Sequence, residues 1–165
     1  QKMEQLKQEL LSISDGGRIP IICDNSPCSY LMIEGLEDTS LQVIDAPTFF
    51  ATRLDKLNIQ LKDEPILIYS VCSQNKAGET DSLIDIANAC SNEVTVTEGI
   101  ACCGFGGDRG FSHPELNASA LSTLAEQSSG CCSGYSSSKT CEIGLKKHSG
   151  IPFNSILQLL DEQSS

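Results

Sequence analysis

The chain has 165 residues, the size of one ordinary domain, and its formal net charge is −11 because 22 acidic residues outnumber 11 basic ones. This charge excludes the attraction to phosphate on which nucleic-acid binding depends, and it opposes binding to anionic lipid headgroups. The sequence also has no apolar run of membrane-spanning length and no signal-peptide pattern, so we expect a soluble protein with no nucleic-acid partner and no direct membrane insertion.

Short apolar runs of the β type alternate with segments of helical periodicity along the chain. The first segment is helical in pattern, with an apolar side made of Met3, Leu6, Leu10 and Ile13. Because the chain enters this pattern at Gln1, without an initiator Met, we expect a piece of a longer polypeptide. The runs that predict strands are Ile19–Cys23, Leu41–Ile44, Pro65–Val71 and Glu93–Thr97. This alternation predicts a single α/β domain over residues 1–165, with a mainly parallel sheet flanked by helices.

Helix signals lie between and after these strands. Ser26 and Pro27 predict an N-cap and a first helical position, which places Cys28 in the first turn. Ser112–Glu115 has the form of a capping box. Apolar helix faces are expected for Phe49, Phe50, Leu54 and Leu57, for Leu83, Ile86, Ala87 and Cys90, and for Leu116, Ala120, Leu121 and Leu124. Short helices are expected over Thr140–Lys147 and Asn154–Asp161, and Ser128–Ser138 is expected to be a loop around a short strand.

Nine cysteines are the strongest compositional signal. An odd number in a chain without a secretory signal disfavours a closed disulfide framework and favours metal or redox chemistry. The two histidines, His113 and His148, have no zinc-finger spacing to the cysteines. Thiolate is therefore the main soft ligand, and His148 is expected to be a surface or cap residue.

Several cysteines lie at the end of a predicted strand or a short turn beyond it. Cys23 ends the first strand, Cys72 follows the third, and Cys102 and Cys103 follow the fourth. Carboxyl ends of parallel strands share one edge of a sheet, the edge at which α/β proteins bind ligands. Cys28 and Cys141 are expected at helix N-termini, where backbone N–H groups favour a thiolate. We therefore expect the sulfurs of distant cysteines to converge in one pocket.

The most specific motif runs from Cys102 to Gly110, with two adjacent thiols opening a glycine-rich loop. Adjacent cysteines rarely form a disulfide with each other, but both can reach a metal–sulfur cluster. Gly104, Gly106 and Gly107 permit left-handed backbone, which lets N–H groups approach cluster or thiolate sulfurs. Arg109 either offsets cluster charge or pairs with Asp108. A tight turn with two buried cysteines is the simpler alternative.

These residues resemble a known family. Cys72, Cys102-Cys103-Gly104 and Cys141 resemble the CCG cysteine-rich motif of heterodisulfide reductase subunits, glycolate oxidase iron–sulfur subunits and anaerobic glycerol-3-phosphate dehydrogenase subunits. Longer runs resemble the D-lactate dehydrogenases that carry FAD and Fe–S clusters: Cys102–Phe111, Pro114–Ala118, Gly134–Ser136, Thr140–Leu145 and His148–Gly150. The likeness extends back to Cys23–Cys28, so it covers nearly the whole chain.

The resemblance implies an electron-transfer domain of a flavin-dependent D-lactate or 2-hydroxyacid dehydrogenase. It implies an iron–sulfur cluster of the 4Fe–4S type held by Cys72, Cys102, Cys103 and Cys141. The motif occurs twice in that family, and Cys23 and Cys28 would belong to a first copy whose double-cysteine loop lies before Gln1. The resemblance also places an FAD domain and a ferredoxin-like segment upstream, with a quinone or other electron acceptor, in the cytoplasm or peripherally at the inner membrane face. This chain alone is not expected to oxidise lactate.

One position departs from the family pattern. The pattern closes with Cys-x-x-Cys, whereas Ser138 stands where the first of these cysteines belongs. Cys131 or Cys132 could supply the missing thiolate, and a packing role for either is equally open. Cys141 is nevertheless expected to be a ligand, as a thiolate favoured by its helix start and by Lys139. Cys90, on an apolar helix face, is expected to be a core residue.

Two other functions remain open. Cysteines could hold zinc in a module that docks a partner subunit without catalysing a reaction. Thiol–disulfide exchange would need a close, reducible cysteine pair, and the absence of a Cys-x-x-Cys motif counts against it.

Overall fold

The structure is a computed structural model that describes residues 2–164. Its strands are β1 (Ile21–Cys23), β2 (Val43–Asp45), β3 (Ile66–Ile68), β4 (Val94–Val96), β5 (Ser133–Ser136) and β6 (Phe153–Ser155). Its helices are α1 (Lys2–Ile13), α2 (Ser26–Gly35), α3 (Ala46–Ala51), α4 (Cys72–Ala77), α5 (Thr80–Cys90), α6 (Arg109–Ser112), α7 (Pro114–Ala120), α8 (Leu124–Gln127), α9 (Lys139–Ser149) and α10 (Ile156–Gln163), with a 3-10 turn, η1, at Leu54–Lys56.

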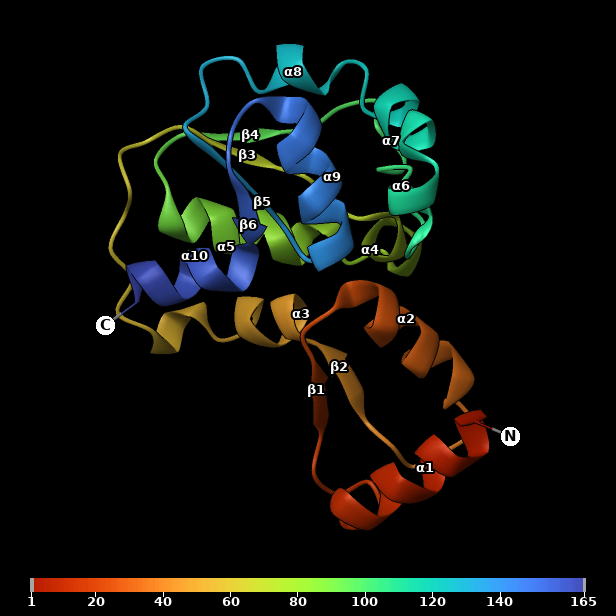
Figure 1. The fold of residues 1–165 in the computed structure, drawn as a ribbon. Coiled ribbons are helices and arrows are strands. Elements are labelled where there is room, and N and C mark those ends of the chain that lie inside the picture. Colours follow the sequence, from red (N-terminus) through yellow and green to blue (C-terminus); the bar gives the residue numbers. More distant parts are fainter. Residues whose placement is uncertain (1, 165) are drawn as a thin grey trace.

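Two sheets, both entirely parallel, confirm the predicted α/β class. β1 and β2 form a separate pair, while the main sheet has the strand order β4-β3-β5-β6. The sequence predicts a single sheet, whereas the structure has two. The pattern of apolar residues indicates where strands lie but carries no signal for which strands pair. In Figure 1 the pair β1–β2 lies with α1 and α2 to one side of the main sheet.

The main sheet is covered on both faces, and its central strand β3 is buried on both. One apolar core contains Leu67 and Tyr69 and lies under α8 and α9, while the other contains Ile66 and Ile68 and lies against α5 and α10. Leu83, Ile86, Ala87 and Cys90 of α5 all lie in the second core, as predicted.

A close approach between β5 and β6 depends on a missing side chain. A Cβ atom on Gly134 would lie 2.3 Å from Cζ of Phe153, so the phenyl ring packs directly on the backbone of β5. This contact joins the edge strand β6 to the first core.

Some predicted helix boundaries are wrong. The N-cap of α2 is Asn25 rather than Ser26. Ser112 ends α6 instead of capping the next helix, because the helix restarts at Pro114 with His113 as its N-cap. The expected face from Leu116 to Leu124 is split between α7 and α8, which leaves Leu116 49% exposed. Asn154, expected in the last helix, lies in β6.

The first helix also differs from its prediction in what it buries. Leu10 is buried, but Ile13 is 72% exposed, so α1 covers less of the protein than its pattern suggests. No helix within residues 2–164 is long and apolar enough to cross a membrane.

A buried polar network joins the small sheet to the main one. Asp45, at the end of β2, is 1% exposed and accepts hydrogen bonds from the hydroxyls of Ser26 (2.7 Å) and Ser29 (2.5 Å). Gln74 of α4 donates a longer bond to Asp45 (3.4 Å) and accepts one from the hydroxyl of Ser137 (2.7 Å). Because Gln74 follows Cys72 closely and Ser137 precedes α9, this network helps to position two predicted ligand segments.

Candidate metal centre

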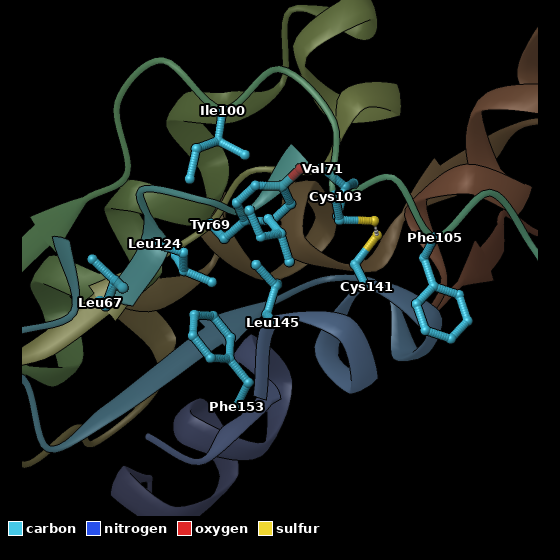
Figure 2. Close-up of a cluster of buried hydrophobic side chains, with 11 residues drawn as sticks. Leu67, Tyr69, Val71, Ile100, Cys103, Phe105, Leu124, Cys141, Leu145 and Phe153 are labelled. Atoms are coloured by element: carbon cyan, nitrogen blue, oxygen red, sulfur yellow. Dashed lines mark hydrogen bonds between the residues drawn. The ribbon is translucent and has the colours of Figure 1, made fainter. Parts of the chain in front are cut away.

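Two buried sulfurs meet at the centre of the site. Sγ of Cys103, in the loop after β4, lies 3.1 Å from Sγ of Cys141, the third residue of α9 (Figure 2). A disulfide would bring them to about 2.05 Å. Two sulfurs bound to one tetrahedral zinc ion at about 2.3 Å each would lie about 3.8 Å apart. The pair is therefore a sulfur–sulfur hydrogen bond and not a disulfide.

The pKa shifts of this pair favour negative charge on Cys103, whereas the sequence favours it on Cys141. The pKa of Cys103 is lowered to about 7, first by the S–H group of Cys141 and then, against the cost of burial, by backbone N–H groups such as that of Phe105. The pKa of Cys141 is raised, because it gives its hydrogen bond to Cys103 and because it is buried. Lys139, expected to favour a thiolate at Cys141, pairs with Glu142 at 3.0 Å instead. Of the two thiols, Cys103 is therefore the one whose pKa favours the thiolate.

Cys72 and Cys102 complete the group. Cys72 is the first residue of α4, after β3, and Cys102 precedes Cys103. Burial is the main cause that raises the pKa of Cys102, and the neighbouring sulfurs of Cys103 and Cys72 add to it. Cys72 also lies near enough to raise the pKa of Cys141. All four predicted ligands therefore lie in electrostatic reach of one another at the carboxyl ends of β3, β4 and β5.

The glycine loop places backbone donors against these sulfurs. Gly104 has a φ of +70°, and its N–H points to Sγ of Cys102 at 3.4 Å. A Cβ atom at this glycine would lie 2.6 Å from the carbonyl oxygen of Leu116. Both the left-handed turn and the close packing require glycine. The predicted approach of N–H groups to sulfur is thus found at Gly104.

The remaining loop residues predicted to bind a cofactor lie farther out. Gly106 and Gly107 have φ values of +55° and +72°, and both are exposed. Arg109 is exposed at the start of α6, and the described residues show no ion pair between it and Asp108. The sulfur contacts of this loop therefore come from its first half.

Asn117 holds the double-cysteine turn from the side of α7. Its amide Nδ2 donates to the carbonyl oxygen of Cys103 at 2.5 Å, and the residue is 2% exposed. A Cβ atom on Gly144 of α9 would lie 2.5 Å from that same nitrogen. Gly144 thus makes room for the amide that fixes Cys103. The sequence motif includes Asn117, but no local signal assigns it this role.

Cys23 and Cys28 form a separate, local arrangement. The thiol of Cys23 donates to the carbonyl oxygen of Asn25 (3.8 Å), and Asn25 Nδ2 donates to Sγ of Cys28 (3.2 Å). No interaction recorded within residues 2–164 joins them to the other four predicted ligands. Cys28 is the third residue of α2, just as Cys141 is the third residue of α9. In both cases the helix begins three residues after the last residue of the preceding strand.

The other three cysteines are not at the site. Cys90 is fully buried in the second core, where burial raises its pKa to about 11, so its predicted core position is confirmed. Cys131 and Cys132 precede β5, at the opposite end of the strand from Cys141. A strand of this length spans about 13 Å. Neither residue can therefore supply the thiolate missing at Ser138.

The four thiols are the residues from which a metal site could be built. Four thiols with backbone N–H donors suit soft metals. The hydroxyl of Tyr69 is buried without a partner in the described part of the chain, and its pKa is raised first by burial and then by the four nearby cysteine sulfurs. The separation of Cys103 and Cys141 is too short as it stands, and within residues 2–164 no three or more Cys, His, Asp or Glu side chains are already arranged around a metal position. Metal binding therefore requires this pair to open.

Comparison with family models, with curated proteins and with solved structures finds no match for this chain.

The pKa of Cys103 yields a testable result. Because the pKa is lowered to about 7, metal-free protein should carry one thiolate above this pH and lose it below. An ultraviolet titration of thiolate absorbance should show one early step, and Cys103→Ser should abolish it while Cys90→Ser leaves it intact. A first step only near the ordinary cysteine value of about 8.5 would contradict the hydrogen-bonded pair.

Proposed function

We propose that this chain is an electron-transfer domain that binds an iron–sulfur cluster through Cys72, Cys102, Cys103 and Cys141. The observation that carries the proposal is the gathering of thiols from three distant segments at one edge of the main sheet, with the pair Cys103–Cys141 at its centre. Backbone N–H groups that point to sulfur, as in this glycine loop, are typical of the surroundings of metal-bound sulfur, and packing of cysteines in a core does not require them.

Such a cluster, when bound, supplies transfer of single electrons. The chain's own residues provide the rest. The buried side chains of Phe105 and Tyr69 exclude water from one side of the thiols. The N–H groups of Gly104 and Phe105 offset negative charge on sulfur. Cys102 is exposed and leaves the opposite side open to an electron partner.

The proposal extends to the longer protein through the resemblance described above. There, an upstream FAD domain would take the hydride equivalent from D-lactate or a similar 2-hydroxyacid. The ferredoxin-like segment and this domain would pass single electrons to a quinone or other acceptor, in the cytoplasm or at the inner membrane face. The pair Cys23 and Cys28 would complete its own site only with a further double-cysteine loop.

The decisive experiment is anaerobic reconstitution of the longer protein with iron and sulfide. Cys141→Ala should lose most iron, acid-labile sulfide and visible absorbance, because it removes a ligand at the centre of the site. Cys90→Ala should keep them and lose only stability, by about 1 to 2 kcal/mol, through a small cavity in the second core. Equal cluster content in both variants would remove Cys141 from the site. Air must be excluded, because the close pair Cys103–Cys141 can also close as a disulfide.

The separation of Cys103 and Cys141 favours zinc as a second candidate, in a module that docks a partner subunit. The pair needs to move apart by less than 1 Å to reach the spacing of about 3.8 Å found around tetrahedral zinc. Zinc gives no visible absorption and no redox signal, whereas an iron–sulfur cluster gives both. Metal analysis of protein purified without air distinguishes the two.

A further inference from the structure

The hydroxyl group of Tyr69 lacks a partner in a place where hydrogen-bonding groups normally have one. The residue is completely buried, and Oη makes no hydrogen bond within the described part of the chain. Leaving a buried hydroxyl unpaired costs free energy, so native proteins nearly always satisfy such groups. A partner outside the protein chain would explain why this position carries tyrosine and not phenylalanine.

The surroundings of Tyr69 indicate what that partner is. Tyr69 follows β3 directly, and its N–H extends the ladder to the carbonyl oxygen of Tyr135 (3.0 Å). Its ring belongs to the same core cluster as Cys103 and Cys141, and Figure 2 shows the three side chains together. Burial is the main cause that raises the pKa of Tyr69, and the sulfurs of Cys103, Cys141, Cys102 and Cys72 are near enough to raise it further. An acceptor held by these sulfurs would therefore lie in its reach.

A second unpaired hydroxyl lies beside the first. Ile68 of β3 pairs with Tyr135 of β5, so the next residues along, Tyr69 and Ser136, lie opposite each other. Neighbouring residues in a parallel ladder point to the same face of the sheet. Ser136 is also fully buried, and its Oγ has no partner in the region described. Two unsatisfied donors thus occupy the ends of adjacent central strands, on the face that carries the cysteines.

We propose that the Tyr69 hydroxyl donates a hydrogen bond to a sulfur of the cluster bound by Cys72, Cys102, Cys103 and Cys141. This inference rests on the proposed function and assigns a specific residue to it. A hydrogen bond to a cluster sulfur offsets negative charge, and this charge is greater in the reduced state. Tyr69 therefore strengthens cluster binding and raises its reduction potential.

The test compares Tyr69→Phe with Tyr135→Phe in the anaerobically reconstituted longer protein. Tyr135 is a matched control, because it is buried on the adjacent strand but lies in the opposite core, where its hydroxyl accepts a bond from Ser133 (3.3 Å). Tyr69→Phe should release iron to a chelator about tenfold faster and shift the potential to more negative values. Tyr135→Phe should match the wild type in both measurements.

Metal-free stability supplies an independent measurement. Tyr69→Phe removes an unpaired oxygen, so the melting temperature of the metal-free variant should equal or exceed that of the wild type. A lower melting temperature would mean that the hydroxyl already has a partner in the protein, and this would overturn the inference.

The remaining outcomes separate this inference from the proposed function. If the wild type binds a cluster and Tyr69→Phe matches it in iron release and in potential, the role of Tyr69 is wrong and the proposed function stands. If both tyrosine variants change equally, the effect belongs to the core in general, and the inference is again wrong. If the wild type takes up no iron and sulfide, both proposals fail.

Discussion

Replacing Asp45 by alanine should lower the free energy of unfolding by about 4 kcal/mol, because the hydroxyls of Ser26 and Ser29 would lose a charged acceptor inside the protein. Asp45 is 1% exposed, so water cannot easily replace the lost bonds. The same change frees Gln74, whose amide bridges Asp45 to Ser137. Urea unfolding followed by circular dichroism measures the loss.

The matched control for this prediction is Asp55→Ala. Asp55 is exposed in the turn η1, so its replacement should alter stability by less than about 0.5 kcal/mol. If the two variants unfolded at the same urea concentration, the network around Asp45 would contribute little. If Asp45→Ala also reduced cluster content, the network would be shown to position Cys72 and α9 as the structure suggests.

Gly104→Ala should strongly damage the double-cysteine loop. A methyl group would have to adopt a φ of +70° and would lie 2.6 Å from the carbonyl oxygen of Leu116 and 2.9 Å from Cβ of Ala120. Backbone strain and steric overlap together should lower the free energy of unfolding by about 3 kcal/mol. A backbone shift that relieved the overlap would also move the N–H group that points to Cys102. Iron content after anaerobic reconstitution should fall with stability.

Gly99→Ala is the control that separates strain from overlap. Gly99 lies in the same connection with a φ of +71°, but nothing stands within 4 Å of its Cβ position. Its replacement should cost about 1 kcal/mol and leave iron content unchanged. Equal losses in the two variants would show that the packing of Gly104 on α7 has no role in the site.

Sequence reasoning predicted the convergence of Cys72, Cys102, Cys103 and Cys141 because it depends on one rule. A residue that comes soon after a parallel strand lies near the carboxyl edge of the sheet, wherever it stands in the sequence, and Cys141 was placed there by its predicted helix start. The core position of Cys90 was predictable for a similar reason, since helical periodicity alone places it on a buried face.

Features that depend on contacts across the fold were not predictable. The opposite pKa shifts of Cys103 and Cys141 arise from their mutual contact, which helix-start reasoning about Cys141 alone does not include. No Cys-x-x-Cys motif marks this pair, because the two cysteines stand 38 residues apart. The sequence also gives no signal that Tyr69 has an unpaired hydroxyl, since this depends on what surrounds it in three dimensions.

The distance along the chain between Cys103 and Cys141 has a consequence for the order of assembly. Because 38 residues separate them, these two sulfurs are held together in the native geometry only when β4 and β5 are both paired with β3 and α9 is packed on the sheet. Closing such non-local contacts is slow compared with forming a helix. During synthesis, a nascent chain that has reached only Cys103 cannot build the centre, however much metal is present. If the four cysteines bind a metal, metal binding would therefore indicate that the central strands have already paired.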